Sequence, residues 1–144
     1  MNATGRALSA CIVIAVIALI TACRKGDFSK QETGAVVLAT DWLHLIDDGN
    51  YAQSWSETAG IFRNAVPRDK WVSTMTSLRK PFGETICRSL RSREYMTSLP
   101  GAPDGEYVVI IFKTSFKNKK DSLETVTTMK DTDGKWRVSG YYIK

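Results

Sequence analysis

Few side chains in this sequence could serve as a general acid or base, and they lie far apart along the chain. His44 is the single histidine, Glu84 and Glu124 are carboxylates in strand-like segments, and a tyrosine, Tyr142, follows in the last such segment. A carboxylate buried in an apolar pocket has a raised pKa and can act as a base near neutral pH. One alternative for this protein is therefore a cavity-based enzyme of the isomerase or dehydratase type that uses Glu124 or Tyr142.

The helical spacing around His44 places that residue away from a cavity. The apolar stripe of its segment centres on Trp42, and at about 100° per residue His44 lies about 200° from that centre. The acidic residues predicted to share this outer side are Asp41, Asp47 and Asp48. For Glu124, a solvated strand face is the simpler interpretation. We therefore expect no catalytic residue and favour a non-enzymatic protein.

The cysteines and short motifs indicate neither a metal nor a cofactor. The chain has three cysteines and no C-x-x-C, HExxH, GxSxG or phosphate-binding glycine loop. Asp131 and Asp133 before Gly134 echo the start of a calcium loop, but the later ligands are missing, which favours a hairpin turn. Cys87 lies in a strand-like run, and we interpret it as a small buried hydrophobic residue; the alternative is a nucleophilic thiol.

The first 22 residues have the pattern of a secretory signal. Residues 1–6 carry one arginine, and the sixteen residues from Ala7 to Ala22 carry no charge, a run shorter than the ~20 residues that a spanning helix needs. Ile20-Thr21-Ala22-Cys23 resembles the bacterial lipobox, in which an aliphatic residue and two small residues precede an obligatory cysteine. The resemblance implies cleavage after Ala22 and acylation of Cys23. An uncleaved single-pass anchor is the alternative.

Lipid on Cys23 would place the protein in the bacterial cell envelope, because two or more acyl chains hold a domain firmly on a membrane. Many lipoproteins that stay in the inner membrane have an aspartate directly after the acylated cysteine. This sequence has Arg24 at that position, so the periplasmic face of the outer membrane is favoured. Removal of the signal segment takes away Arg6, so the mature chain has 19 Lys and Arg residues and 15 Asp and Glu residues. This excess is mild and no nucleic-acid-binding motif accompanies it, so we expect a membrane and not a nucleic acid as partner.

Behind a tether at residues 23–30, residues 31–144 are predicted to form one domain. A capping box of Ser29 and Glu32 predicts a first helix that ends at Gly49, a second short helix carries Tyr51, and a third begins at residue 67. The period then changes from helical to alternating, which predicts strands at 84–98, 106–116, 122–130 and 135–144. Three helices before four consecutive strands indicate an α+β fold with an antiparallel sheet.

Alternation also predicts which strand residues share a face. In the last strand, Trp136, Val138 and Tyr142 are predicted to share one face. In the first strand, Arg91 and Arg93 are predicted to lie opposite Arg88; that basic strand is interpreted as a solvated edge. The alternative is a patch that meets an acidic partner or lipid headgroups.

The order of these elements resembles the nuclear-transport-factor-2-like (cystatin-type) cone. Four segments, "WLHLIDDGNYAQSW", "WVSTMTSLRKPFG", "LPGAPDGEYVVIIFKTSF" and "DGKWRVSGYYI", resemble the bacterial envelope family called domain of unknown function 4019. Together they extend over most of residues 35–143. The resemblance implies a cone of three N-terminal helices packed on a curved four-stranded antiparallel sheet, and it implies no activity.

These observations predict a membrane-anchored bacterial envelope lipoprotein of unknown molecular function. Its domain would bind an envelope protein or a small apolar ligand without catalysis, and a homodimer through the open sheet face is a third option. Tryptophans spread over three helices and a strand are interpreted as core residues. The residues that could line a cavity are Trp42, Trp55, Trp71, Phe112, Glu124 and Tyr142.

Overall fold

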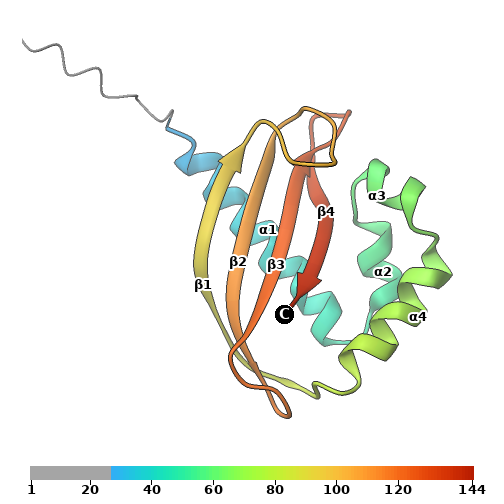
Figure 1. Ribbon diagram of the computed structural model, residues 1–144. Helices are drawn as coiled ribbons and strands as arrows, with labels where there is room; N and C mark the ends of the chain where they lie inside the picture. The colour runs from blue at the N-terminus through green and yellow to red at the C-terminus, as the bar shows by residue number, and fades with distance from the viewer. Residues whose placement is uncertain (1–26) are drawn as a thin grey trace, which may run out of the picture.

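Four helices and one four-stranded antiparallel sheet make up the part of the chain that the structure, a computed structural model, describes, residues 27–144 (Figure 1). The predicted signal peptide and Cys23 lie outside these residues. The elements are α1 Ser29–Asp47, α2 Tyr51–Ser56, α3 Gly60–Ala65, α4 Arg68–Arg79, β1 Thr85–Met96, β2 Tyr107–Phe116, β3 Ser122–Lys130 and β4 Trp136–Ile143. None of these helices is long and apolar enough to cross a membrane. The predicted α+β class and antiparallel sheet are confirmed.

The strands follow one another in the sheet in the order β1-β2-β3-β4, and every neighbouring pair is antiparallel. Helix α1 crosses one face of this sheet, while α2, α3 and α4 lie together beside β4 (Figure 1). Because the strands are joined as consecutive hairpins, each turn lies at one of the two ends of the sheet. The β2–β3 turn lies at the end opposite the start of α1.

The core lies between α1, α4 and the covered face of the sheet. Residues of the core cluster include Ala39, Leu43 and Ile46 of α1, Met75 of α4, and Val108, Ile110, Val126 and Val138 of the sheet. Each fully buried aliphatic side chain contributes about 1.5–3 kcal/mol to folding. Within this core the rings of Trp42 and Trp71 lie 6.1 Å apart, and the ring of Tyr141 lies 5.5 Å from that of Trp42.

The sequence predicted three helices, and the structure has a fourth, α3, where a break was expected. The residues before α3 also extend the sheet: Thr58 bridges to Val138, and the Ala59 N–H donates to the Val138 carbonyl at 2.8 Å. The Gly60 N–H donates to Asp131 Oδ2 at 2.9 Å. The contact with Val138 covers part of the edge of β4, which would otherwise be open to another strand.

A bulge in β4 reverses the predicted alternation near its end. Val138 pairs with Thr128, but Gly140 pairs with Thr127, which leaves one residue of β4 unpaired between them. Beyond an extra residue, the following side chains change face. The tyrosine that faces the helices is therefore Tyr141, while Tyr142 is 60% exposed. The predicted grouping of Tyr142 with Val138 is wrong for this reason.

Two irregularities in β1 change that strand in the same way. The register shifts between Thr85 and Cys87 and again between Leu90 and Ser92. As a result Arg88 pairs with Thr114, and Arg93 pairs with Ile110, both of which are buried residues of β2. Arg88 and Arg93 therefore share the face that looks toward α1, which the uninterrupted alternation did not predict.

Candidate functional site

The most concentrated group of charged side chains is a buried cluster around Glu124, which has no exposed surface. Its Oε1 accepts hydrogen bonds from Tyr141 Oη at 2.6 Å and from Arg79 Nη1 at 3.3 Å. Its Oε2 accepts from Arg88 Nε at 2.7 Å and from Thr114 Oγ1 at 2.5 Å. Four elements, α4, β1, β2 and β4, thus converge on one carboxylate of β3.

A second carboxylate, Asp47 at the end of α1, completes this cluster. Asp47 accepts from Arg79 Nη2 at 2.9 Å and from Arg88 Nη1 at 2.8 Å. Thr85 Oγ1 donates to Asp47 Oδ1 at 2.8 Å. The two carboxylates and two guanidinium groups balance in charge, which is the condition under which ionised groups are tolerated in an interior. The sequence had placed Asp47 on the outer side of its helix, and this is wrong because α4 and β1 cover the last turn of α1.

The pKa values of the surrounding groups follow from this arrangement. Burial acts to raise the pKa of Asp47, but hydrogen bonds and charges from Arg88, Thr85 and Arg79 outweigh it, so the pKa lies below its ordinary value. Burial acts to lower the pKa of Arg88, but Asp47 and Glu124 raise it further above its ordinary value. Burial, followed by the charge and hydrogen bond of Glu124, raises the pKa of Tyr141.

Because a carboxylate has about four acceptor sites, the four hydrogen bonds to Glu124 occupy its capacity. A general base must reach a substrate proton with a free lone pair, and here those positions are taken by protein donors. The prediction that Glu124 lies on a solvated strand face is wrong. Glu124 is buried, but it belongs to an internal cluster of charged groups and has no acceptor position left for a substrate. Glu84, the other acid predicted to lie in a strand, is exposed in the loop just before β1.

The other candidate cavity residues do not meet in one cavity. Trp42, Trp71 and Phe112 are buried in the core, and Trp55 is half-buried with its Nε1 donating to the Val66 carbonyl at 2.7 Å. Trp42 Nε1 donates to the Ser54 carbonyl at 2.9 Å. Indole N–H groups that are paired within the protein stabilise the core. Tyr142, as described above, faces away from it.

Two further expectations concern single residues. His44 is exposed on α1, as predicted. Cys87 is also exposed, so its interpretation as a buried hydrophobic residue is wrong. The bulge next to Cys87 turns its side chain away from the helices, since the buried face of β1 is taken by Thr85 and Arg88. In the described residues, no group of three or more His, Cys, Asp or Glu side chains could hold a metal ion.

An apolar groove of about 290 Å³ lies between α3 and the loop before β2. Its walls come from α3, from residues 99–102 and from the face of the sheet opposite α1. Its apolar and aromatic side chains are Ile61, Phe62, Ala65, Leu99, Pro100, Ala102, Tyr107 and Met129. Hydroxyl groups at its floor belong to Thr127 and Ser139. No cavity residue predicted from the sequence lines this groove.

The sequence carried signals for parts of the cluster that were not used. Arg79 follows Trp71 and Met75 at intervals of four residues, so it belongs to the same buried helical face. Glu124 precedes Val126 by two residues and therefore shares its buried face. Tyr141 had no comparable signal, because its position depends on the bulge.

Comparison with known families gives one match. Residues 38–141 match the family described as "Protein of unknown function (DUF4019)". This chain belongs to that family. The DUF4019 match extends from the middle of α1 into β4 and includes every residue of the Glu124 cluster. A comparison with curated proteins finds no significant match.

Proposed function

We propose that this DUF4019 protein is a lipid-anchored protein of the bacterial cell envelope whose folded domain binds a small apolar ligand and catalyses no reaction. The proposal includes a nuclear-transport-factor-2-like cone, with three predicted N-terminal helices and the added α3. The observation that carries it is the contrast between two places in the domain. The buried acid is fully hydrogen-bonded, whereas the groove beside α3 is apolar and open.

The proposed anchor is Cys23, acylated after cleavage of the preceding 22 residues. Its support is the uncharged run from Ala7 to Ala22 and the lipobox-like Ile20-Thr21-Ala22 that precedes the cysteine. Two or more acyl chains give stable attachment, while one gives only reversible binding. The absence of an aspartate after Cys23 favours the periplasmic face of the outer membrane.

The groove supports binding of a small apolar group. Its volume of about 290 Å³ is close to the lower end of the 300–1,000 Å³ range of ligand pockets. Apolar side chains on the walls and a few hydroxyl groups on the floor are the usual composition of such sites. The alternative of a cavity enzyme that uses Glu124 or Tyr142 gains no support, because Glu124 is saturated and Tyr142 lies on the surface.

The groove is testable with an apolar dye such as N-phenylnaphthylamine, whose fluorescence rises on transfer from water to an apolar site. Replacing the exposed Ala65 on the groove wall by tryptophan fills the space, so we expect Ala65→Trp to weaken dye binding at least tenfold. The matched control is Thr74→Trp, on the exposed side of α4 outside the groove. Equal dye binding by wild type and both variants contradicts a ligand site at the groove.

A further inference from the structure

A second surface feature lies at the end of the domain formed by the β2–β3 turn. We call it the basic tip, and it consists of Lys80, Lys113, Lys117, Lys119 and Lys120. All five side chains are exposed. Two carboxylates, Glu84 and Asp121, lie among them, and Asp121 forms an exposed ion pair with Lys113 at 3.0 Å. Lys117 and Lys120 have no carboxylate partner among the described residues, so their charges face solvent.

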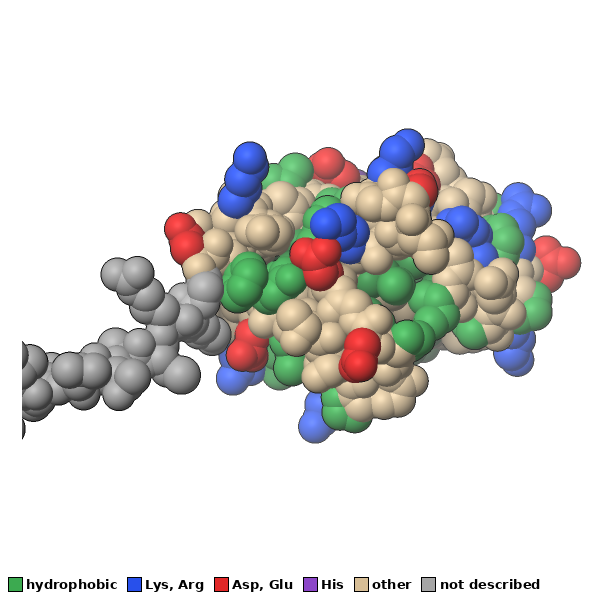
Figure 2. Space-filling view, turned by 90° about the horizontal axis from the view of Figure 1, so that it is seen from above, with side chains coloured by type: hydrophobic (Ala, Val, Ile, Leu, Met, Phe, Trp, Pro, Cys, Tyr) green, Lys and Arg blue, Asp and Glu red, His purple; other side chains and the backbone are tan. Residues whose placement is uncertain are grey.

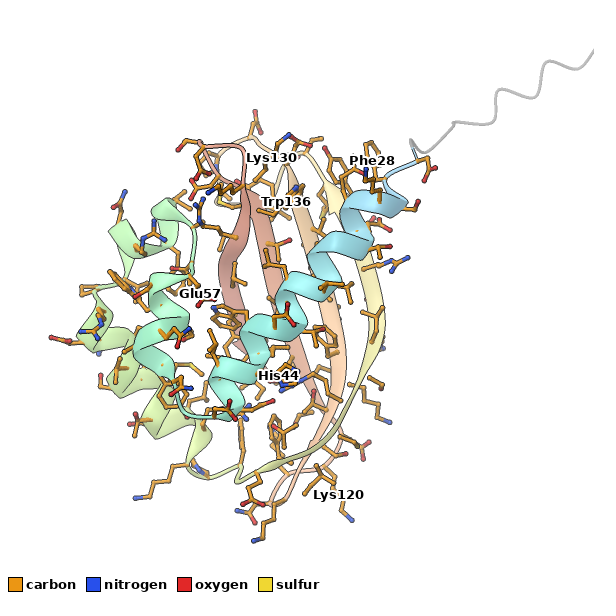
Figure 3. All side chains as sticks on the ribbon, turned by 180° about the vertical axis from the view of Figure 1, so that it is seen from behind. Phe28, His44, Glu57, Lys120, Lys130 and Trp136 are labelled. Atoms are coloured by element: carbon orange, nitrogen blue, oxygen red, sulfur yellow. The ribbon has the colours of Figure 1, made fainter. Side chains whose placement is uncertain are left out.

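The basic tip is opposite the end where the N-terminal segment joins the domain. Phe28 precedes α1 and stacks on Tyr95 with ring centroids 3.9 Å apart. Tyr95 pairs with Val108 at the start of β2, whereas the tip follows Phe116 at the end of β2. Eight residues of strand at ~3.3 Å each separate the two ends by roughly 26 Å. Figure 3 shows Phe28 and Lys120 at the two ends of the sheet.

The positive charge of the domain is concentrated at this tip. Apart from Arg6, Arg24 and Lys25, all Lys and Arg residues lie in the described residues, which gives 17 of the 20 against all 15 Asp and Glu residues. The basic tip has five lysines against two carboxylates, so the rest of the described domain has a net negative charge. At the other end, seen in Figure 2, acidic and basic side chains are mixed.

Contacts between two loops give the basic tip a fixed shape. The Lys117 N–H donates to the Glu84 carbonyl at 2.8 Å, and the Asn118 N–H donates to the Phe82 carbonyl at 3.0 Å. Phe82 stacks on Phe116, and the Lys119 ammonium lies over the Phe82 ring, 4.9 Å from its centroid. The turn after β2 is therefore held against the loop before β1, and its lysines form one surface.

Between these loops a glycine is required. Gly83 has a φ of +71°, and a Cβ there would lie 3.1 Å from Asn118 Nδ2 and 3.2 Å from Lys117 Cβ. Only glycine adopts this conformation readily and leaves room for the turn. The close approach of the two loops therefore depends on glycine at position 83.

From the position, charge and shape of the basic tip, we infer that it binds the carboxylate-rich peptidoglycan of the cell wall. This inference rests on the proposed anchor, which directs the tip away from the membrane. The five residues from Cys23 to Phe28 can add at most ~17 Å to the domain's own ~26 Å. The basic tip can therefore contact a polymer that lies within roughly 43 Å of the anchoring membrane.

The choice of lysine supports a flexible polyanion as the ligand. Arginine and large aromatic residues are enriched in protein–protein interfaces, while lysine is depleted there. Lysine is a point charge on a flexible stem and accepts carboxylates in varied positions. The exposed cations of the basic tip are lysines, with one exposed arginine, Arg91, near Lys113 at its margin. The nearby Arg79 and Arg88 are committed to the buried cluster.

The experiment measures co-sedimentation of the full-length lipoprotein, in non-ionic detergent, with protein-free peptidoglycan sacculi. The triple variant Lys117→Gln, Lys119→Gln, Lys120→Gln should bind about tenfold more weakly, the equivalent of three exposed ion pairs at about 0.5 kcal/mol each. The matched control neutralises three exposed lysines elsewhere, Lys30, Lys70 and Lys135, and should bind like wild type. Amidation of the sacculus carboxylates or 0.5 M NaCl should abolish binding.

The inference is overturned if wild type does not sediment with sacculi, if the two triple variants bind equally, or if amidated sacculi bind as well as native sacculi. Binding to vesicles containing phosphatidylglycerol but not to sacculi would also overturn it, in favour of a membrane surface. Because the assay is done in detergent, a failure to bind sacculi does not depend on the anchor. A failure of the proposed anchor would instead be seen as a protein without bound lipid. The dye experiment tests the groove independently of both.

Discussion

Replacing Glu124 by glutamine should destabilise the domain strongly, because this carboxylate connects α4, β1, β2 and β4. Glutamine keeps the size of the side chain but removes the charge between Arg79 and Arg88. Its NH₂ group also cannot accept from two of the four donors that now bind the carboxylate. Removing one partner of a buried ion pair costs about 3–5 kcal/mol, a large part of the 5–15 kcal/mol that stabilises an ordinary domain.

The assay is urea unfolding followed by tryptophan fluorescence, with the slope of free energy against urea unchanged between variants. Glu84→Gln is the matched control, since Glu84 is an exposed glutamate in the loop before β1, and it should change the unfolding free energy by less than about 0.5 kcal/mol. Combining Glu124→Gln with Arg88→Gln should cost less than the sum of the single changes. A cost below about 1 kcal/mol for Glu124→Gln refutes the structural role assigned to the cluster.

Three further predictions concern individual residues. The folded-state pKa of Asp47 lies below its ordinary value of 3.8. The ionised Asp47 therefore stabilises the fold above about pH 4, and this stabilisation is lost as the pH falls through the folded-state pKa. When the free energy of unfolding is measured between pH 2 and 7, it should fall less steeply at acid pH in Asp47→Asn than in wild type. Tyr141→Phe should cost about 1–3 kcal/mol in urea unfolding, since it removes the 2.6 Å bond to Glu124, while Tyr142→Phe should cost less than about 0.5 kcal/mol, and equal costs contradict the bulge. Native protein should react with iodoacetamide at Cys87 without denaturant, and peptide mass mapping that finds this thiol protected contradicts its exposure.

Three of the four helices, the four strands and the antiparallel sheet could be predicted from the sequence because each extended segment has a consistent pattern. Trp42 and Ile46 repeat at helical spacing, and Val108, Ile110 and Phe112 alternate along a central strand whose covered face is buried. Burial of these side chains determines the local structure, so the sequence and the structure agree there.

Two members of the Glu124 cluster, Arg88 and Tyr141, could not be predicted because their positions depend on single-residue irregularities. One extra residue in β4 turns Tyr141 toward the helices in place of Tyr142, and register shifts in β1 direct Arg88 toward the same side. Such bulges change the faces of all following residues without a clear change of composition. Helix α3 was missed for a related reason, since its six residues from Gly60 to Ala65 are too few to show a helical period.

Lipid on Cys23 is proposed to hold this DUF4019 domain in the envelope, and the proposed location depends on it. The most direct measurement is intact-mass and peptide mass spectrometry of the protein extracted from its native membranes. We predict that the mature chain begins at Cys23 and carries a diacylglyceryl group with an acylated amino terminus. A chain that still includes residues 1–22, or that begins at an unmodified Cys23, would contradict the claim.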